Sequence, residues 1–129
     1  MKKTPPVMHE FDPEIYPVRL WVCISNDMKV LNKWFVNATN GNEVSTTHKV
    51  GGIAMTQYVM NKETGNYGAV ILILSRKELD YETVAHESSH AASIIWRHIG
   101  ESEWGEEANA YLIGWIAQCI EQTKNHKTT

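Results

Sequence analysis

The sequence predicts an α+β fold in which a small mixed sheet of three or four strands packs against two C-terminal helices. Two observations predict this class. Strand-like apolar segments dominate the chain up to Leu74, and after Ser75 the apolar residues recur at helical spacing. The 129 residues are the length of one ordinary domain. We therefore expect one domain over 18–129, preceded by an N-terminal arm over 1–17 that contains all four prolines.

The first half of that domain is expected to hold a strand and a short helix. The segment "VRLWVCIS" (18–25) is rich in β-branched and aromatic residues, which is typical of a strand. Apolar residues at helical spacing follow, with Ser25 or Asn26 as a plausible N-cap, and predict a helix over about 27–37. The next segment is polar and glycine-containing, so we expect a loop with a short strand near Val44 to His48.

A β-hairpin is expected next. The segments "GIAMTQYVM" (52–60) and "YGAVILIL" (67–74) flank "NKETGN", which is a turn signal. Because the second segment is apolar throughout, we expect it to be covered on both faces of the sheet. The first mixes polar and apolar positions, so we expect residues 53–60 to form an edge strand.

Two helices complete the chain. The helical pattern is broken once, at "HIGESEWGEE", where Gly100 and Gly105 interrupt it. This predicts one helix over about 80–99 and a second over about 105–123.

Composition limits the class of protein. The formal net charge is −3 and 21% of the residues are charged, so neither disorder nor a nucleic-acid-binding surface is indicated. Prolines interrupt the N-terminal segment, and no apolar run approaches the length of a membrane span. We expect a soluble, cytoplasmic protein with no membrane partner, in which Cys23 and Cys119 stay unpaired. The sequence does not indicate an oligomeric state.

The segment "YETVAHESSHAASIIW" (81–96) carries the chemistry. His86 and His90 are four residues apart on one helix, so both imidazoles can face one point, and neutral imidazoles suit zinc. Glu87 is placed to take a proton from a zinc-bound water. The alternative is a buried helix with two hydrogen-bonded histidines. We favour zinc, because burying these groups unpaired in such an apolar helix would be costly.

A catalytic zinc site needs a third protein ligand. His98 lies eight residues after His90, about 12 Å along the helix, and is unsuited to the role. Glu106 and Glu107 open the last helix about 100° apart, so at most one of them can be a ligand. Amphipathicity favours Glu106, which is nearer the apolar face of that helix. Both also suit the first turn as simple helix-stabilising acids.

The HExxH helix followed by "EANAYLIG" resembles the gluzincins, a clan of zinc peptidases. The resemblance maps the family's glutamate ligand to Glu107 and its downstream glycine to Gly114, and it favours Glu107 over Glu106. Tyr111 stands where many gluzincins carry an aspartate that orients a ligand histidine, and could do so by hydrogen bonding. Residues 67–120 are also similar to small phage-encoded and prophage-encoded HExxH…ExxAY proteins.

The resemblance implies a minimal zincin-like domain, with Zn²⁺ held by His86, His90 and Glu107 and with Glu87 as general base. The implied function is zinc-dependent hydrolysis of a peptide or protein substrate bound along the edge strand, in a groove above the histidines. The alternative is a non-catalytic, zinc-stabilised phage structural or regulatory protein. Weaker candidates for stabilising an oxyanion are Tyr58, Tyr67, His48 and Arg97.

Overall fold

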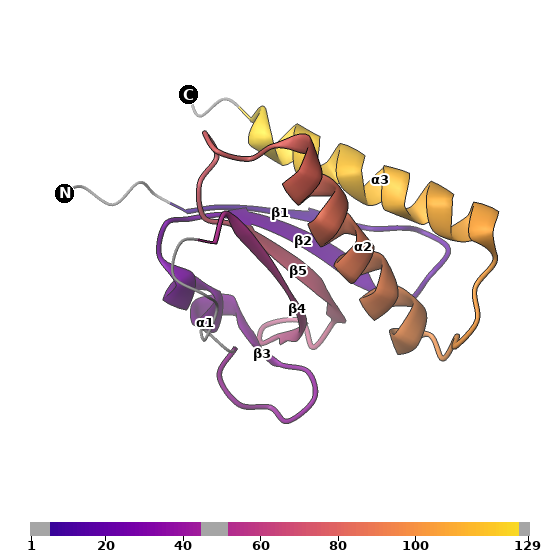
Figure 1. The fold of residues 1–129 in the computed structure, drawn as a ribbon. Coiled ribbons are helices and arrows are strands. Elements are labelled where there is room, and N and C mark those ends of the chain that lie inside the picture. The colour runs from indigo at the N-terminus through magenta and orange to yellow at the C-terminus, as the bar shows by residue number, and fades with distance from the viewer. Residues whose placement is uncertain (1–5, 45–51, 127–129) are drawn as a thin grey trace.

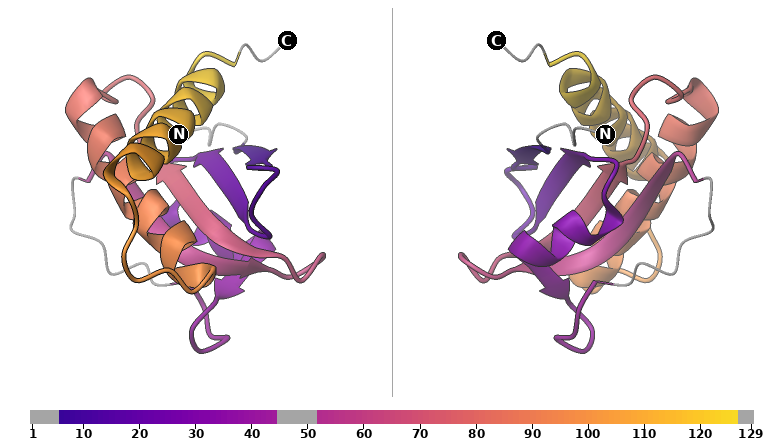
Figure 2. Two further views of the ribbon diagram at one scale, coloured as in Figure 1. Left: turned by 90° about the vertical axis from the view of Figure 1, so that its right-hand side faces the viewer. Right: turned by 90° about the vertical axis from the view of Figure 1, so that its left-hand side faces the viewer.

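A computed structural model describes residues 6–44 and 52–126 of the chain. The elements, in chain order, are β1 (Val7–Phe11), β2 (Arg19–Ile24), the 3₁₀ helix η1 (Met28–Val30), α1 (Leu31–Trp34), β3 (Phe35–Asn37), β4 (Ala54–Asn61), β5 (Tyr67–Ile73), α2 (Tyr81–His98) and α3 (Glu106–Lys124). Helices α2 and α3 cover one face of the sheet and the short α1 lies on the other (Figures 1 and 2). The α+β class is confirmed.

The sheet is mixed, as expected, but it has five strands in the order β1-β2-β5-β4-β3. The prediction of three or four strands was therefore wrong. Strands β2 and β5 are parallel, and every other neighbouring pair is antiparallel. The two additional strands are short segments at the edges: β1 lies inside the expected N-terminal arm, and β3 inside the expected first helix.

The central strand β5 is buried on both faces, which confirms the prediction made from "AVILIL". Ala69, Ile71 and Ile73 face a core formed with α2 and α3, while Val70 and Leu72 face a second core against α1. Each fully buried aliphatic side chain of this size contributes roughly 1.5–3 kcal/mol. The antiparallel hairpin of β4 and β5 is also confirmed, with its turn at residues 62–66.

The helix expected over 27–37 is much shorter. Asp27 caps η1 by accepting a hydrogen bond from the backbone N–H of Lys29, and helical structure ends at Trp34. At Phe35 the chain becomes extended, and Phe35 packs against Trp21 with ring centroids 4.9 Å apart. Pairing with β4 and burial of this ring override the local helical pattern. The expected strand near Val44 to His48 is absent at Val44, and its other residues lie outside the described ones.

Helices α2 and α3 confirm the two C-terminal predictions to within one or two residues. Asp80 is the N-cap of α2, and Gly100, with a φ of 85°, follows its end. Helix α3 packs beside the C-terminal half of α2, where the indole N–H of Trp96 donates a hydrogen bond of 2.9 Å to Asn109. Within the described parts of the chain, no helix is long and apolar enough to cross a membrane.

Both cysteines are free and buried. Cys23 belongs to the core on the α1 side of the sheet and Cys119 to the core on the α2 and α3 side. Burial raises the pKa of each thiol to about 12. The sheet separates the two thiols, so they cannot form the disulfide that their number alone would allow.

Candidate functional site

The three motif residues lie on the face of α2 that borders β4. His86 and His90 place their Nε2 atoms 3.1 Å apart, with the two rings nearly perpendicular at 78°. The helical spacing of four residues accounts for this proximity. The expectation that both imidazoles face one point is confirmed.

Glu87 is the buried member of the motif. Its carboxylate accepts a hydrogen bond of 2.7 Å from the hydroxyl of Thr56 on β4. The other carboxylate oxygen, Oε2, lies 3.9 Å from Nε2 of His86. The carboxylate is therefore held between β4 and the pair of histidines.

The histidines are not in the apolar environment that the sequence led us to expect. The His86 side chain is 65% exposed, whereas that of Glu87 is 8% exposed. His90 is exposed as well. The cost of burying unpaired imidazoles therefore does not argue for a metal here. The alternative of a buried helix with two hydrogen-bonded core histidines is wrong for the same reason.

A groove runs between β4 and α2, as expected for the edge strand and the motif helix. It consists of two adjoining pockets of about 250 and 270 Å³ that share His86 and Glu87. The first is also lined by Thr56, His90, Ser93, Ile94 and Arg97, and the second by Ile53, Ala54, Glu82 and Thr83. The motif residues therefore lie at the middle of the groove.

Strand β4 is an edge strand over only part of its length. Its partner β3 pairs with Val59–Asn61, and the backbone N–H of Ala38 donates to the carbonyl of Tyr58. No other described strand pairs with this side of β4. Antiparallel pairing alternates the direction of backbone groups, so those of Ala54 and Thr56 point to this unpaired side. The expectation of an edge strand over 53–60 holds for the end of β4 that lies beside Glu87.

The predicted third ligand is not at this site. Helix α3 begins beside the C-terminal half of α2, and His86 precedes Trp96 by ten residues, or about 15 Å of helix. Glu107 is exposed in the first turn of α3, as is Glu106. Across residues 6–44 and 52–126, no group of three His, Cys, Asp or Glu side chains is placed to hold a metal ion. The gluzincin ligand set is therefore wrong.

Two further details of that resemblance also fail. Tyr111 is 77% exposed and points away from the core, so it does not orient a ligand histidine. A Cβ atom built on Gly114 would have no neighbour within 4 Å, so this glycine does not allow a close approach of α3 to α2. The segment "EANAYLIG" therefore resembles the gluzincin motif in sequence only. Its residues do not surround the histidine pair as the resemblance implied.

Comparisons with known proteins give no support for a family. No protein-family model matches the chain, and neither a curated protein nor a solved structure matches it. Together with the position of Glu107, this overturns the resemblance to gluzincins and to phage-encoded HExxH proteins.

Sequence reasoning missed Thr56, the residue that holds Glu87. A signal was present, because Thr56 is a polar residue in "AMTQYVM", within the edge strand expected to border the groove above the histidines. The residue with which it would pair could not be known before the order of strands and helices was known.

The weaker candidates fall into two groups. Arg97 lines the groove. Tyr58 and Tyr67 instead surround His98, and the Tyr58 hydroxyl lies 2.6 Å from Nδ1 of His98. Burial and the neighbouring Tyr67 raise the pKa of Tyr58. His48 lies outside the described residues.

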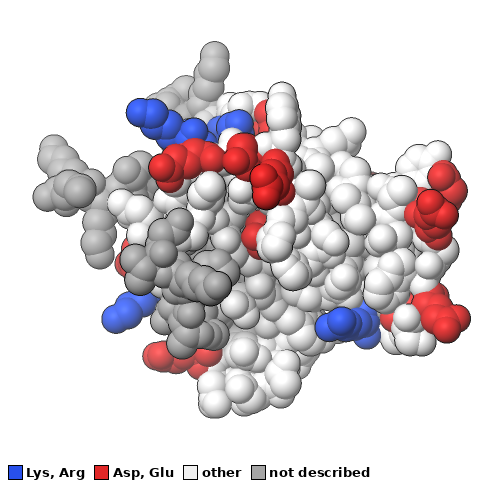
Figure 3. Space-filling model, viewed as in Figure 1, with Lys and Arg blue, Asp and Glu red and all other residues white. Residues whose placement is uncertain are grey.

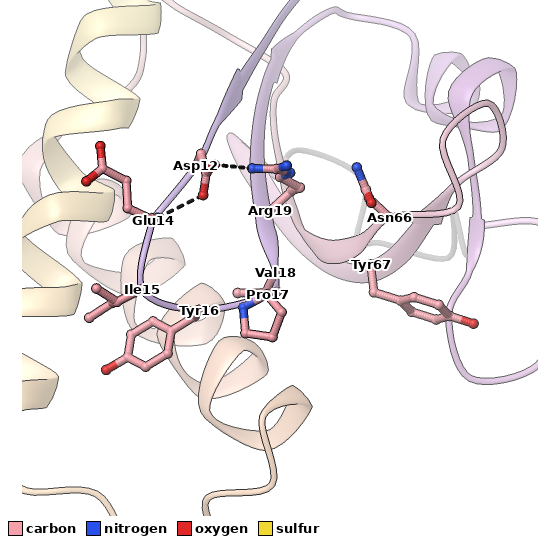
Figure 4. Close-up of a pocket in the computed structure, with 9 residues that line it drawn as sticks. All are labelled: Asp12, Glu14, Ile15, Tyr16, Pro17, Val18, Arg19, Asn66 and Tyr67. Atoms are coloured by element: carbon pink, nitrogen blue, oxygen red, sulfur yellow. Dashed lines mark hydrogen bonds and ion pairs between the residues drawn. The ribbon is translucent and has the colours of Figure 1, made fainter.

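A larger pocket, of about 510 Å³, lies at the turn between β1 and β2 (Figure 4). Asp12 there forms an ion pair with Arg19 and accepts a hydrogen bond from the backbone N–H of Glu14. Both contacts hold the pKa of Asp12 below its usual value, and the backbone hydrogen bond has the larger effect. Asp12 and Arg19 neutralise each other, and the described residues of the pocket include no pair of side chains placed to exchange a proton, as His86 and Glu87 are in the groove.

Proposed function

We propose that the protein is a zinc-dependent peptidase in which His86 and His90 hold the metal and Glu87 is the general base. The observation that carries the proposal is the convergence of three groups: two Nε2 atoms 3.1 Å apart and a buried carboxylate 3.9 Å from one of them. They lie in a groove beside a strand whose outer side is partly unpaired in the described structure.

The donor set suits zinc in part. Two imidazole nitrogens that share one tetrahedral zinc ion at about 2.0–2.1 Å lie roughly 3.3 Å from each other, close to the separation seen here. The described residues offer two such ligands, whereas catalytic zinc sites ordinarily have three from the protein. We therefore expect weaker binding than in a three-ligand site.

A bound zinc ion would supply Lewis acidity, which lowers the pKa of water and polarises a carbonyl group. The protein's own contribution begins with Glu87. The hydrogen bond from Thr56 engages its Oε1, so Oε2 is the oxygen that remains on the side of His86 and can accept a proton. The same carboxyl group can then deliver that proton to the leaving amine.

Strand β4 would bind the substrate. The unpaired backbone groups of Ala54 and Thr56 can hydrogen-bond an extended peptide, which would add a strand to the sheet directly above Glu87. The proposal includes the cytoplasmic location expected from the sequence, where the two free cysteines would stay reduced.

The alternative is a non-catalytic zinc protein, although structural zinc sites ordinarily have four protein ligands and the described residues offer two. Its usual form, in which a metal ties two helices together, does not suit this site, because both histidines are on α2 and no α3 residue lines the groove. A zinc ion held by these two histidines would contact only α2 and the neighbouring strand β4.

The deciding experiment compares wild type with Glu87→Gln. Both proteins are loaded with one equivalent of zinc and incubated with a mixed peptide library, and cleavage is followed by mass spectrometry. We expect cleavage by wild type and a loss of about 10²–10⁴-fold in Glu87→Gln, with zinc still bound.

Glu107→Gln is the matched control, because it removes an exposed carboxylate from another helix. It should cleave like wild type. Zinc-loaded wild type that cleaves nothing would leave the non-catalytic alternative as the better interpretation. Equal cleavage by wild type and Glu87→Gln would remove the general base from the proposal.

A further inference from the structure

The groove beside β4 carries opposite charges at its two ends. Glu82 lines it near the start of α2 and Arg97 near the end of the same helix. Apart from the motif residues, the side chains between these ends are uncharged. Figure 3, in the orientation of Figure 1, shows acidic side chains gathered over the N-terminal end of α2 and a largely uncharged surface along the helix.

Arg97 has no ion-pair or side-chain hydrogen-bond partner within the structure described, and it is exposed. A basic residue in the last turn of a helix is favourable toward the helix dipole, and this accounts for the charge. This interaction with the helix dipole leaves the five N–H donors of the Arg97 guanidinium group unused. Their geometry suits a bidentate contact with a carboxylate.

We propose that Arg97 is an anion subsite that selects peptides with an aspartate or glutamate side chain. This inference rests on the proposed function, because it assigns specificity to the same groove. His90 and Arg97 are seven residues apart, or about 10.5 Å along α2. An extended peptide advances about 3.3 Å per residue. The acidic side chain therefore lies about three residues from the peptide bond at the histidine pair.

The direction of the peptide follows from the contacts of β4. Thr56 contacts Glu87, and Tyr58 contacts His98 further along α2, so β4 and α2 run in the same direction beside the groove. The peptide can pair with β4 only at Ala54 and Thr56, because β3 and Ala38 occupy the outer side from Tyr58 onward, so its residues nearer Arg97 leave the sheet edge and follow α2. If it pairs antiparallel to β4, the more common arrangement, it runs from the Arg97 end toward the Glu82 end. The acidic residue is then on the N-terminal side of the bond at the histidines.

The test measures binding without hydrolysis. A random decapeptide library, displayed on phage, is selected against immobilised full-length Glu87→Gln protein in the presence of zinc. We expect at least tenfold enrichment of aspartate and glutamate at one position of the aligned binders. In the Glu87→Gln, Arg97→Glu double variant this enrichment should be lost and replaced by lysine or arginine at the same position.

Two further variants keep the result interpretable. Arg97→Gln on the same background removes the charge without adding an acid to the helix end. It should lose the enrichment while unfolding only a few degrees below the Glu87→Gln protein, because the favourable interaction with the helix dipole is small. Lys33→Glu makes the same charge reversal on α1, across the sheet from the groove, and should keep the enrichment.

Selection without acidic enrichment, or the same enrichment in Arg97→Gln, would overturn the subsite. Acidic enrichment on the C-terminal side of the bond that wild type cleaves would overturn the antiparallel direction. Cleavage by wild type without any charge preference would leave the proposed peptidase standing and remove the Arg97 subsite. Charge-selective binding without cleavage would support the Arg97 subsite and contradict the proposed peptidase.

Discussion

The Thr56 hydroxyl donates a hydrogen bond of 2.7 Å to Oε1 of Glu87, joining β4 to α2 at the centre of the groove. Glu87 is the only charged residue among the buried ones on the described part of α2. A buried carboxylate is costly unless it is hydrogen-bonded, so this contact is what makes the position of Glu87 tolerable. It also fixes which carboxylate oxygen remains on the side of His86.

We expect Thr56→Val to lower the free energy of unfolding by about 1–3 kcal/mol, because it leaves Glu87 buried without its partner. Urea unfolding followed by circular dichroism measures this change. Thr56→Ser is the matched control, since it keeps the hydroxyl group, and it should be clearly more stable than Thr56→Val. Equal stability of the two variants would mean that the hydrogen bond contributes nothing to the fold.

We expect purified wild type to bind about one zinc ion per chain, through the Nε2 atoms of His86 and His90. His86→Ala and His90→Ala should each weaken binding by more than about tenfold, because each leaves one imidazole. Isothermal titration calorimetry measures the affinity. Glu107→Gln should bind zinc like wild type, since Glu107 lies on α3 away from the pair. Unchanged affinity in both histidine variants would refute the metal site.

Much of the fold could be predicted because the local patterns were strong. The apolar run of β5, the turn before it and the periodicity of α2 each point to one structure. The edge strands β1 and β3 could not be found in this way. Both are short, and their places depend on contacts between elements: the indole N–H of Trp21 on β2 donates to Glu10 on β1, and β3 pairs with Val59–Asn61 across a long connection.

In the candidate site, too, contacts within one element could be predicted and contacts between elements could not. His86, Glu87 and His90 share one helix, so their proximity follows from helix geometry alone. The third ligand was different, because Glu107 is on another helix and its position depends on how α3 packs. The sequence contains no local signal for that packing. Thr56 was missed for the same reason, as its contact with Glu87 spans 31 residues.

The start of the motif helix should be sensitive to acid. The backbone N–H of Thr83 donates to the Asp80 carboxylate, and this holds the pKa of Asp80 below its usual value. A lowered folded pKa contributes stability above the unfolded pKa of about 3.9, and that contribution is lost as the pH falls through the folded pKa.

The matched variant for this effect is Asp80→Asn, which keeps a capping oxygen but cannot titrate. We expect wild type to melt at a higher temperature than Asp80→Asn at pH 6, and the difference to shrink toward zero at about pH 2. Thermal unfolding at a series of pH values measures it. A difference that stays constant over this range would show that the carboxylate charge does not stabilise α2.

Two glycines should respond to alanine in opposite ways. A Cβ on Gly68 of β5 would lie 1.9 Å from the carbonyl oxygen of Arg19 on β2, so the parallel pairing at the sheet centre would have to shift. We expect Gly68→Ala to lower the free energy of unfolding by about 3 kcal/mol or more. Gly114 is in the interior of α3, exposed and with no atom within 4 Å of such a Cβ.

Gly114→Ala should therefore raise the free energy of unfolding by about 0.5–1 kcal/mol, because alanine loses less backbone entropy in a helix and meets nothing here. Urea unfolding of both variants beside wild type gives the two values. The result for Gly114 also bears on the third ligand, since a glycine that allowed α3 to approach a metal on α2 would make alanine destabilising. A loss of stability in Gly114→Ala would contradict the packing of α3 described above.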